Sequence, residues 1–119
     1  MIWAKIASIF MFLGVALGAF GSHALKGKVS DYHIDIYKTG VFYHFVHALG
    51  LFAIAWLSIH FGNSKFNLAG IFLTAGIIVF SGSLYIYSIT NFRWLGFVTP
   101  IGGLCFLIGW CIVSVNILK

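Results

Sequence analysis

The sequence of 119 residues carries a net charge of +5, but only 8% of its residues are charged and 61% are hydrophobic, including 18% aromatic residues. This composition excludes an ordinary soluble domain, whose charged fraction is about a quarter. The seven Lys and Arg residues are scattered singly along the chain. The net charge therefore does not indicate nucleic-acid binding, which needs basic residues clustered on one face.

Charged residues divide the chain into four apolar stretches. Each stretch holds at least 20 uncharged residues; they lie between Lys5 and Lys26, Lys38 and Lys65, Lys65 and Arg93, and Arg93 and Lys119. A helix of about 20 apolar residues crosses a hydrocarbon core of roughly 30 Å and pairs its own backbone there. The sequence predicts an all-α integral membrane protein: one domain over residues 1–119, a compact bundle of transmembrane helices over residues 2–25, 31–61, 67–90 and 96–118.

The first span has two interpretations. Lys5, the apolar run and the string "GAFGS" resemble a signal peptide, and its cleavage would leave three spans. However, the apolar run is long for a signal peptide, and Gly14 and Gly18 form a G-x-x-x-G motif that is typical of helix packing in membranes. We therefore expect the first span to be retained and to pack through these glycines.

The other spans carry boundary signals. Ser30 can cap the second helix, and the carboxylate of Asp31 suits its positive N-terminal end. Pro100 is expected in the first turn of the fourth helix, where its missing N–H costs little. Gly102 and Gly103 predict close helix contact there. An even number of spans places both termini on one side; the basic residues differ by only one between the two sides, so the orientation of the bundle stays open.

Polar side chains of the spans concentrate toward one membrane surface, where the first and third helices end and the second and fourth begin. His44 and His47 continue a polar stripe on the second helix, and His23 ends the first. We expect a polar pocket that opens on this surface. Its predicted lining residues are His23, Tyr43, His44, His47, Ser81, Ser83, Tyr85 and Thr99.

The histidines of this pocket have two interpretations. His23, His44 and His47 could bind a metal ion or haem or relay protons, because ionisable groups inside a membrane are functional candidates. Alternatively, neutral rings hydrogen-bond to serine, tyrosine and threonine and hold the helices together. No H-E-x-x-H or Cys/His spacing is present to support a metal site. The cofactor therefore stays open between none, haem and a metal ion.

Five short motifs resemble those of a known family. The strings "GAFGSHALK", "YKTGVFYHFVHAL", "FSGSLYIYS", "TPIGG" and "GW" occur in the order and spacing of a family of small four-helix membrane proteins, "domain of unknown function 423", which is also similar to animal transmembrane protein 256. The resemblance implies a bacterial inner-membrane location and no established function. The positions that match its motifs are His23, Tyr43, His44, His47, Ser81, Ser83, Tyr85, Thr99, Pro100, Gly102 and Gly103.

We expect a small membrane protein that acts by binding, as an accessory subunit of a larger membrane complex or as a homo-oligomer within the lipid bilayer. No arrangement of nucleophile, base and acid indicates an enzyme, and no catalytic residue is predicted. One alternative is a haem- or metal-binding redox protein that uses His23, His44 and His47. Another is a small transporter or proton path, which is less favoured because the spans carry no carboxylate or lysine near mid-depth.

Overall fold

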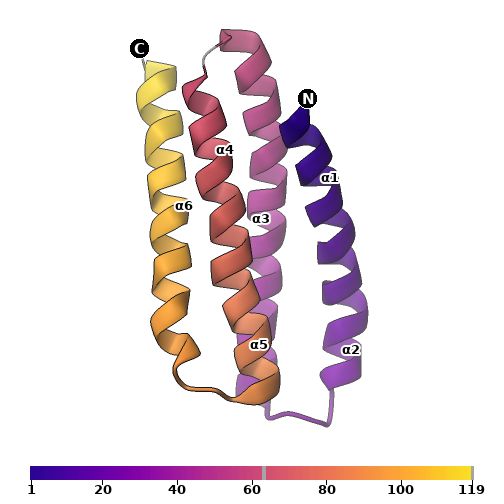
Figure 1. The fold of residues 1–119 in the computed structure, drawn as a ribbon. Coiled ribbons are helices and arrows are strands. Elements are labelled where there is room, and N and C mark those ends of the chain that lie inside the picture. Colours follow the sequence, from indigo (N-terminus) through magenta and orange to yellow (C-terminus); the bar gives the residue numbers. More distant parts are fainter. Residues whose placement is uncertain (63, 119) are drawn as a thin grey trace.

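In the part of the chain that the structure describes, four long helical spans lie side by side in a flattened bundle (Figure 1). The computed structural model describes residues 1–62 and 64–118, and its Cα atoms extend over 49 × 26 × 17 Å. The first span consists of α1 (Ile2–Val15), the π-helical turn η1 (Ala16–Gly21) and α2 (Ser22–Leu25); the second is α3 (Asp31–Phe61); the third consists of α4 (Lys65–Gly76), the π-helical turn η2 (Ile77–Ser81) and α5 (Gly82–Thr90); the fourth is α6 (Leu95–Leu118).

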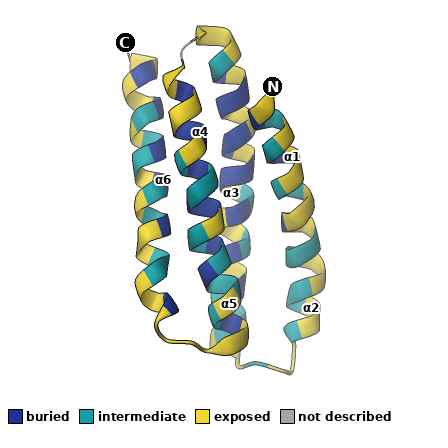
Figure 2. Cartoon of the chain, viewed as in Figure 1, coloured by how far each residue is buried: buried dark blue, intermediate teal, exposed yellow. Residues whose placement is uncertain are grey.

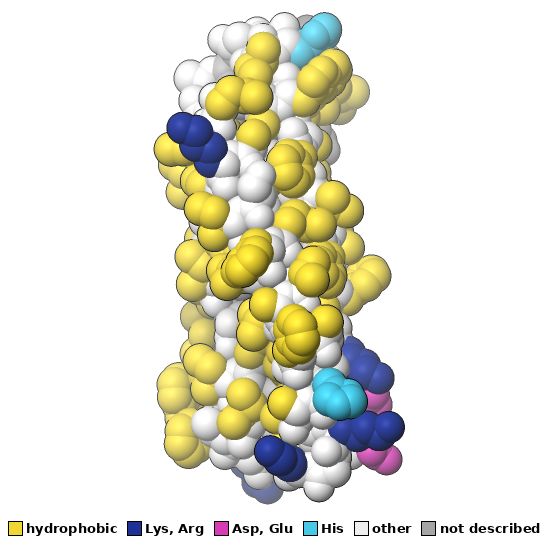
Figure 3. Space-filling model, turned by 90° about the vertical axis from the view of Figure 1, so that its right-hand side faces the viewer, with side chains coloured by type: hydrophobic (Ala, Val, Ile, Leu, Met, Phe, Trp, Pro, Cys, Tyr) yellow, Lys and Arg dark blue, Asp and Glu magenta, His cyan; other side chains and the backbone are white. Residues whose placement is uncertain are grey.

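The predicted membrane bundle is confirmed. Within the described residues, four segments are long and apolar enough to cross a bilayer: Ile2–Leu25, Asp31–Phe61, Lys65–Thr90 and Leu95–Leu118. Both chain ends lie at the same end of the bundle (Figure 1). Charged side chains gather near the two ends, and the surface over the first span is largely apolar between them (Figure 3). This distribution is that of a protein whose middle lies in hydrocarbon and whose ends lie at the interfaces.

The two helix-boundary signals predicted from the sequence, Ser30 and Pro100, have different outcomes in the structure. Ser30 caps α3, with its side chain accepting a hydrogen bond from the backbone N–H of His33 at 3.2 Å. Pro100, expected in the first turn of α6, lies inside this helix because α6 already begins at Leu95. Proline has no N–H, so it cannot make the usual helical bond to the carbonyl of Gly96. Pro100 therefore interrupts the backbone pairing of α6 at its second turn.

α3 lies at the centre of the bundle. α1 packs on α3, α3 packs on the third span, and α6 packs on α4 and η2 (Figure 1). In the most apolar window of each span, 50% of residues are buried in the second span but only 11% in the first. Figure 2 shows the buried residues concentrated on α3 and α4. The outer faces of the first and fourth spans are therefore left for lipid.

Glycines on the contact faces receive side chains from neighbouring helices. A Cβ atom at Gly14 would lie 2.9 Å from the ring of Phe45, and one at Gly18 would lie 3.1 Å from Val41. Gly70 holds the indole of Trp3 in the same way. In lipid, close van der Waals contact is the main source of helix association, and a glycine lets a large ring approach the backbone. The G-x-x-x-G motif of the first span thus faces α3.

Neighbouring Gly102 and Gly103 differ in their surroundings. A Cβ at Gly102 would collide with the backbone of Phe80 in η2, so α6 and η2 meet here backbone to backbone. At Gly103 the nearest atom of the Phe80 ring is 3.8 Å away. The sequence predicted a helix contact at both glycines, but only Gly102 needs to lack a side chain.

We therefore expect Gly102→Ala to destabilise the protein by about 1–3 kcal/mol, the usual cost of overpacking. Gly103→Ala is the matched control; it adds the same methyl group to the adjacent residue and is expected to leave stability unchanged or slightly raised, since alanine favours a helix. Thermal unfolding of both variants in the same detergent measures the difference. Equal unfolding temperatures for the two variants would contradict the backbone contact.

Candidate functional site

His44 is buried between the first span and α5, with 3% of its surface exposed. Its Nε2 lies 2.7 Å from the carbonyl oxygen of Phe10, and its Nδ1 lies 2.8 Å from the hydroxyl of Tyr85. Because a carbonyl oxygen can only accept, Nε2 carries a proton and donates it to Phe10. The Tyr85 hydroxyl donates to Nδ1 of the neutral ring. His44 thus connects α1 and α5 through both of its nitrogens.

His47, 4% exposed, has the opposite tautomer. Its Nδ1 donates to the carbonyl oxygen of Tyr43 at 2.8 Å, and its Nε2 accepts from the indole N–H of Trp110 at 3.0 Å. An indole N–H only donates, so Nε2 must offer its lone pair and the ring is neutral. The ring also stacks on Phe106, with centroids 3.6 Å apart. His47 thus joins α3 to α6.

Hydroxyl groups make similar connections. Ser81 donates to the carbonyl of Gly40 at 2.8 Å, which ties η2 to α3. The hydroxyls of Ser83 and Thr99 lie 2.6 Å apart and tie α5 to α6. Tyr37 donates to the carbonyl of Leu17 inside η1, where the wider π-helical turn leaves a carbonyl accessible. These polar side chains therefore link the helices through hydrogen bonds. This is the second interpretation from the sequence, in which polar groups hold the bundle together.

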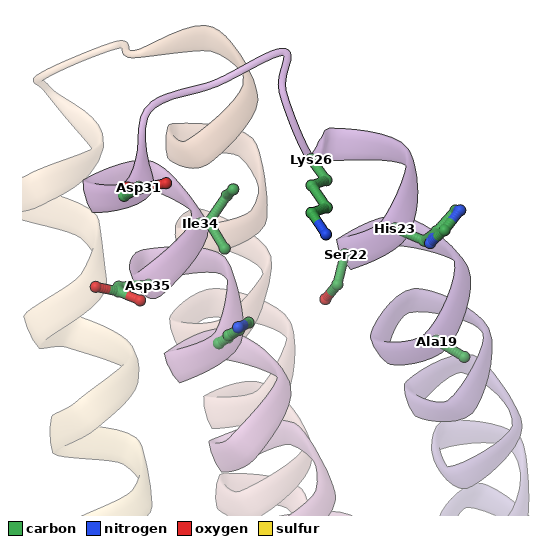
Figure 4. Close-up of a pocket in the computed structure, with 8 residues that line it drawn as sticks. Ala19, Ser22, His23, Lys26, Asp31, Ile34 and Asp35 are labelled. Atoms are coloured by element: carbon green, nitrogen blue, oxygen red, sulfur yellow. The ribbon is translucent and has the colours of Figure 1, made fainter.

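His23 does not join the buried histidines. It is exposed on α2 and lines a separate cleft of about 520 Å³ between α2 and the start of α3, which also holds Lys26 and Asp35. In Figure 4, Lys26 extends toward the gap between the two helices, whereas His23 points away from it. Phe10, the partner of His44, lies thirteen residues before His23, or about 20 Å along a helix.

The predicted pocket of His23 with His44 and His47 is therefore wrong. Its error is one of depth: α3 extends over 31 residues, and its first two turns belong to the interface, so His44 and His47 lie near its middle while His23 lies at a helix end. Within residues 1–62 and 64–118, no group of three or more His, Cys, Asp or Glu side chains could hold a metal ion. Both nitrogens of His44 and His47 are already bonded. These residues do not fit the metal or haem site considered from the sequence.

Tyr43 faces a lateral groove and takes no part in the hydrogen bonds that His44 makes to α1 and α5. This deep groove, of about 480 Å³, lies between α3, η2 and α6. Tyr43 is 38% exposed, and its hydroxyl has no hydrogen-bond partner among the described residues. The residues that define the groove are Tyr43, His47, Phe80, Pro100, Gly103, Leu104, Phe106, Leu107 and Trp110. Sequence reasoning missed it, although Pro100, Gly103, Leu107 and Trp110 share one helical face.

A second hollow lies closer to the α5–α6 connection. This surface groove, of about 380 Å³, also lies between α3, the third span and α6, and it shares Pro100 with the deep groove. Its other principal lining residues are Tyr32, Leu84, Tyr87, Arg93 and Gly96. Arg93 supplies the cation at this end. In the sequence, Arg93 served only to separate the third apolar stretch from the fourth.

Opposite tautomers of His44 and His47 can be measured by ¹⁵N NMR of histidine-labelled protein at neutral pH. We expect His44 to be protonated at Nε2 and His47 at Nδ1, because their carbonyl partners require it. The variants His44→Gln and His47→Gln assign the signals. A shared tautomer, a doubly protonated ring or a metal-shifted nitrogen at either residue would contradict the bonding described above.

Comparison with known proteins gives the family. Residues 17–103 match the family model described as "Protein of unknown function (DUF423)". The chain is 45% identical over 115 residues to the UPF0382 membrane protein YwdK of Bacillus subtilis (96% of this chain, 94% of that protein). It is 40% identical over 116 residues to the UPF0382 membrane protein SH2409 of Staphylococcus haemolyticus (96% and 93%). No solved structure matches.

A further relative comes from a bacterium with two membranes. The UPF0382 inner membrane protein YgdD of Escherichia coli is 35% identical over 113 residues, which cover 95% of this chain and 86% of that protein. The four apolar spans fit the same location. The resemblance identified from the sequence motifs is thus confirmed. The chain is an integral protein of the bacterial inner membrane and belongs to the DUF423 family, whose curated members are named UPF0382 membrane proteins.

Proposed function

We propose that this protein binds an amphipathic molecule from the bilayer, and that the deep groove holds the apolar part of this molecule. The observation that carries the proposal is the hydroxyl of Tyr43. Tyr43 lies three residues from the middle of α3, or about 5 Å along the helix axis, and its hydroxyl has no hydrogen-bond partner among the described residues. An unpaired hydroxyl in hydrocarbon costs several kcal/mol, so a polar group of a ligand is its natural partner.

The lining of the groove supports a membrane-soluble ligand. Phe80, Leu107 and Trp110 offer apolar and aromatic surface, and His47 is neutral with both nitrogens bonded. Leu107 is 69% exposed on the outer side of α6, so the groove opens sideways toward lipid. A molecule dissolved in the bilayer can therefore enter without crossing a polar barrier. Binding pockets of this kind combine apolar walls with a few polar groups that orient the ligand.

The transport alternative receives less support from the same contacts. A proton path needs groups that can exchange protons along a chain, but His44 donates to a backbone carbonyl, which cannot pass a proton on. The only acids of the chain, Asp31 and Asp35, lie at the start of α3 and line the cleft beside α2. Binding of a ligand in the deep groove requires no group that exchanges protons.

Native mass spectrometry of protein extracted from bacterial membranes tests the proposal. We expect wild-type protein to retain a stoichiometric membrane-derived molecule. Gly103→Phe should lose it, because the new ring fills the deep groove at a residue with space for a side chain. Tyr43→Phe should weaken retention by roughly tenfold, the equivalent of about 1.4 kcal/mol for one lost hydrogen bond.

Gly82→Phe is the matched control. It introduces the same ring at another glycine with space for a side chain, since no atom lies within 4 Å of its Cβ position, and Gly82 lines neither groove. This variant should retain the molecule as wild type does. Wild-type protein that is folded and empty, or equal retention by Gly103→Phe and Gly82→Phe, would refute binding in the deep groove.

A further inference from the structure

We infer that the bound molecule is an anionic phospholipid of one leaflet, with its phosphate at Arg93 in the surface groove, an ester carbonyl that accepts from the Tyr43 hydroxyl, and an acyl chain in the deep groove. The inference rests on the proposed function and adds a second attachment point to it. It assigns a role to Arg93 and to the surface groove, neither of which the contacts within the bundle use.

The two grooves lie on one face of the molecule. On α3, Tyr32 lines the surface groove and Tyr43 the deep groove; eleven residues correspond to about three helical turns, so both side chains project from the same face. On α6 the same holds for Gly96 and Leu107, with Pro100 lining both grooves between them. An extended molecule can therefore lie along α6 and occupy both grooves at once.

Arg93 supplies the charge that selects the headgroup. It is the one cation among the described residues that line either groove, and its guanidinium group has no hydrogen bond or ion pair within the described part of the chain. Asp31 and Asp35, which could neutralise it, line the cleft beside α2 instead. A guanidinium group matches the geometry of a phosphate and binds it through paired charge-assisted hydrogen bonds. An anionic headgroup thus complements an otherwise uncompensated charge.

The length of the path matches one leaflet. From Gly96 in the surface groove to Trp110 in the deep groove, α6 rises over fourteen residues, or about 21 Å. Half of a bilayer with its headgroup regions is roughly 20–22 Å thick. A phospholipid spans this distance from its phosphate to the end of its chains. Tyr32 and Tyr87 lie at the headgroup end, where tyrosine hydroxyls are favoured.

The test compares two lipids with the same acyl chains, phosphatidylglycerol and phosphatidylcholine, added to delipidated full-length protein and counted as bound lipid by native mass spectrometry. Wild-type protein should prefer phosphatidylglycerol by about fivefold or more at low salt, and the preference should fall as salt rises. Arg93→Gln should bind both lipids alike, whereas Arg93→Lys should retain part of the preference because it keeps the charge.

Lys26→Gln is the matched control for charge. It removes one cation at the same end of the bundle, from the cleft beside α2. An equal loss of preference in Lys26→Gln and Arg93→Gln would overturn the inference, since the effect would then arise from the general surface potential. A preference that survives in Arg93→Gln, or its absence in wild type, would overturn it as well.

Gly103→Phe separates the two proposals. If this variant loses both lipids while Arg93→Gln keeps the wild-type preference, the deep groove binds lipid and only the headgroup assignment fails. If Gly103→Phe binds both lipids as wild type does, the proposed function itself fails. The thermal unfolding temperature of each variant is measured as well. A value equal to that of wild type shows that a loss of bound lipid does not come from unfolding.

Discussion

The structure depends on one constraint: inside a bilayer, every polar group must find its partner within the protein. The two buried histidines meet it in opposite ways. His44 offers its Nε2 proton to a carbonyl of α1, and His47 offers its Nδ1 proton to its own helix and accepts from Trp110. Each ring thereby fixes how α3 is rotated against its neighbours. The buried hydroxyls of Ser58 and Thr74 also have no partner among the described residues. The unpaired hydroxyl of Tyr43 differs from them because Tyr43 lines the deep groove, which a molecule from outside the chain can enter.

A second determinant of the structure is the contact of glycines with large rings. In lipid, no hydrophobic driving force brings helices together, so they associate through close van der Waals contact. Such contacts are made by Gly14 with Phe45, by Gly70 with Trp3, and by Gly102 with the backbone of Phe80. Because each contact needs a missing side chain on one helix and a ring or backbone segment on the other, it also specifies the register of the two helices. Hydrogen bonds and these contacts together give a bundle in which α3 is central.

The fold was predictable from the sequence because lipid imposes a length and an absence of charge on every span. The candidate site was predictable only in part. Burial of His44 and His47 follows from the cost of polar groups in hydrocarbon, but their partners do not: Phe10 contributes a backbone oxygen, which leaves no sign in the sequence. The sequence also suggested a shared site for His23, although the predicted bounds already placed His23 at the end of the first span and His44 thirteen residues into the second.

The order in which the spans pack has a consequence for how the protein is made. Spans that follow one another in the sequence also pack on one another: α3 on α1, the third span on α3, and α6 on α4 and η2. A helix that leaves the translocation machinery therefore meets one of its packing partners already in the membrane. His44 gains the carbonyl of Phe10 as soon as α3 inserts, and the bond to Tyr85 follows with the next helix. Assembly can thus follow the direction of translation, without any span having to exchange neighbours.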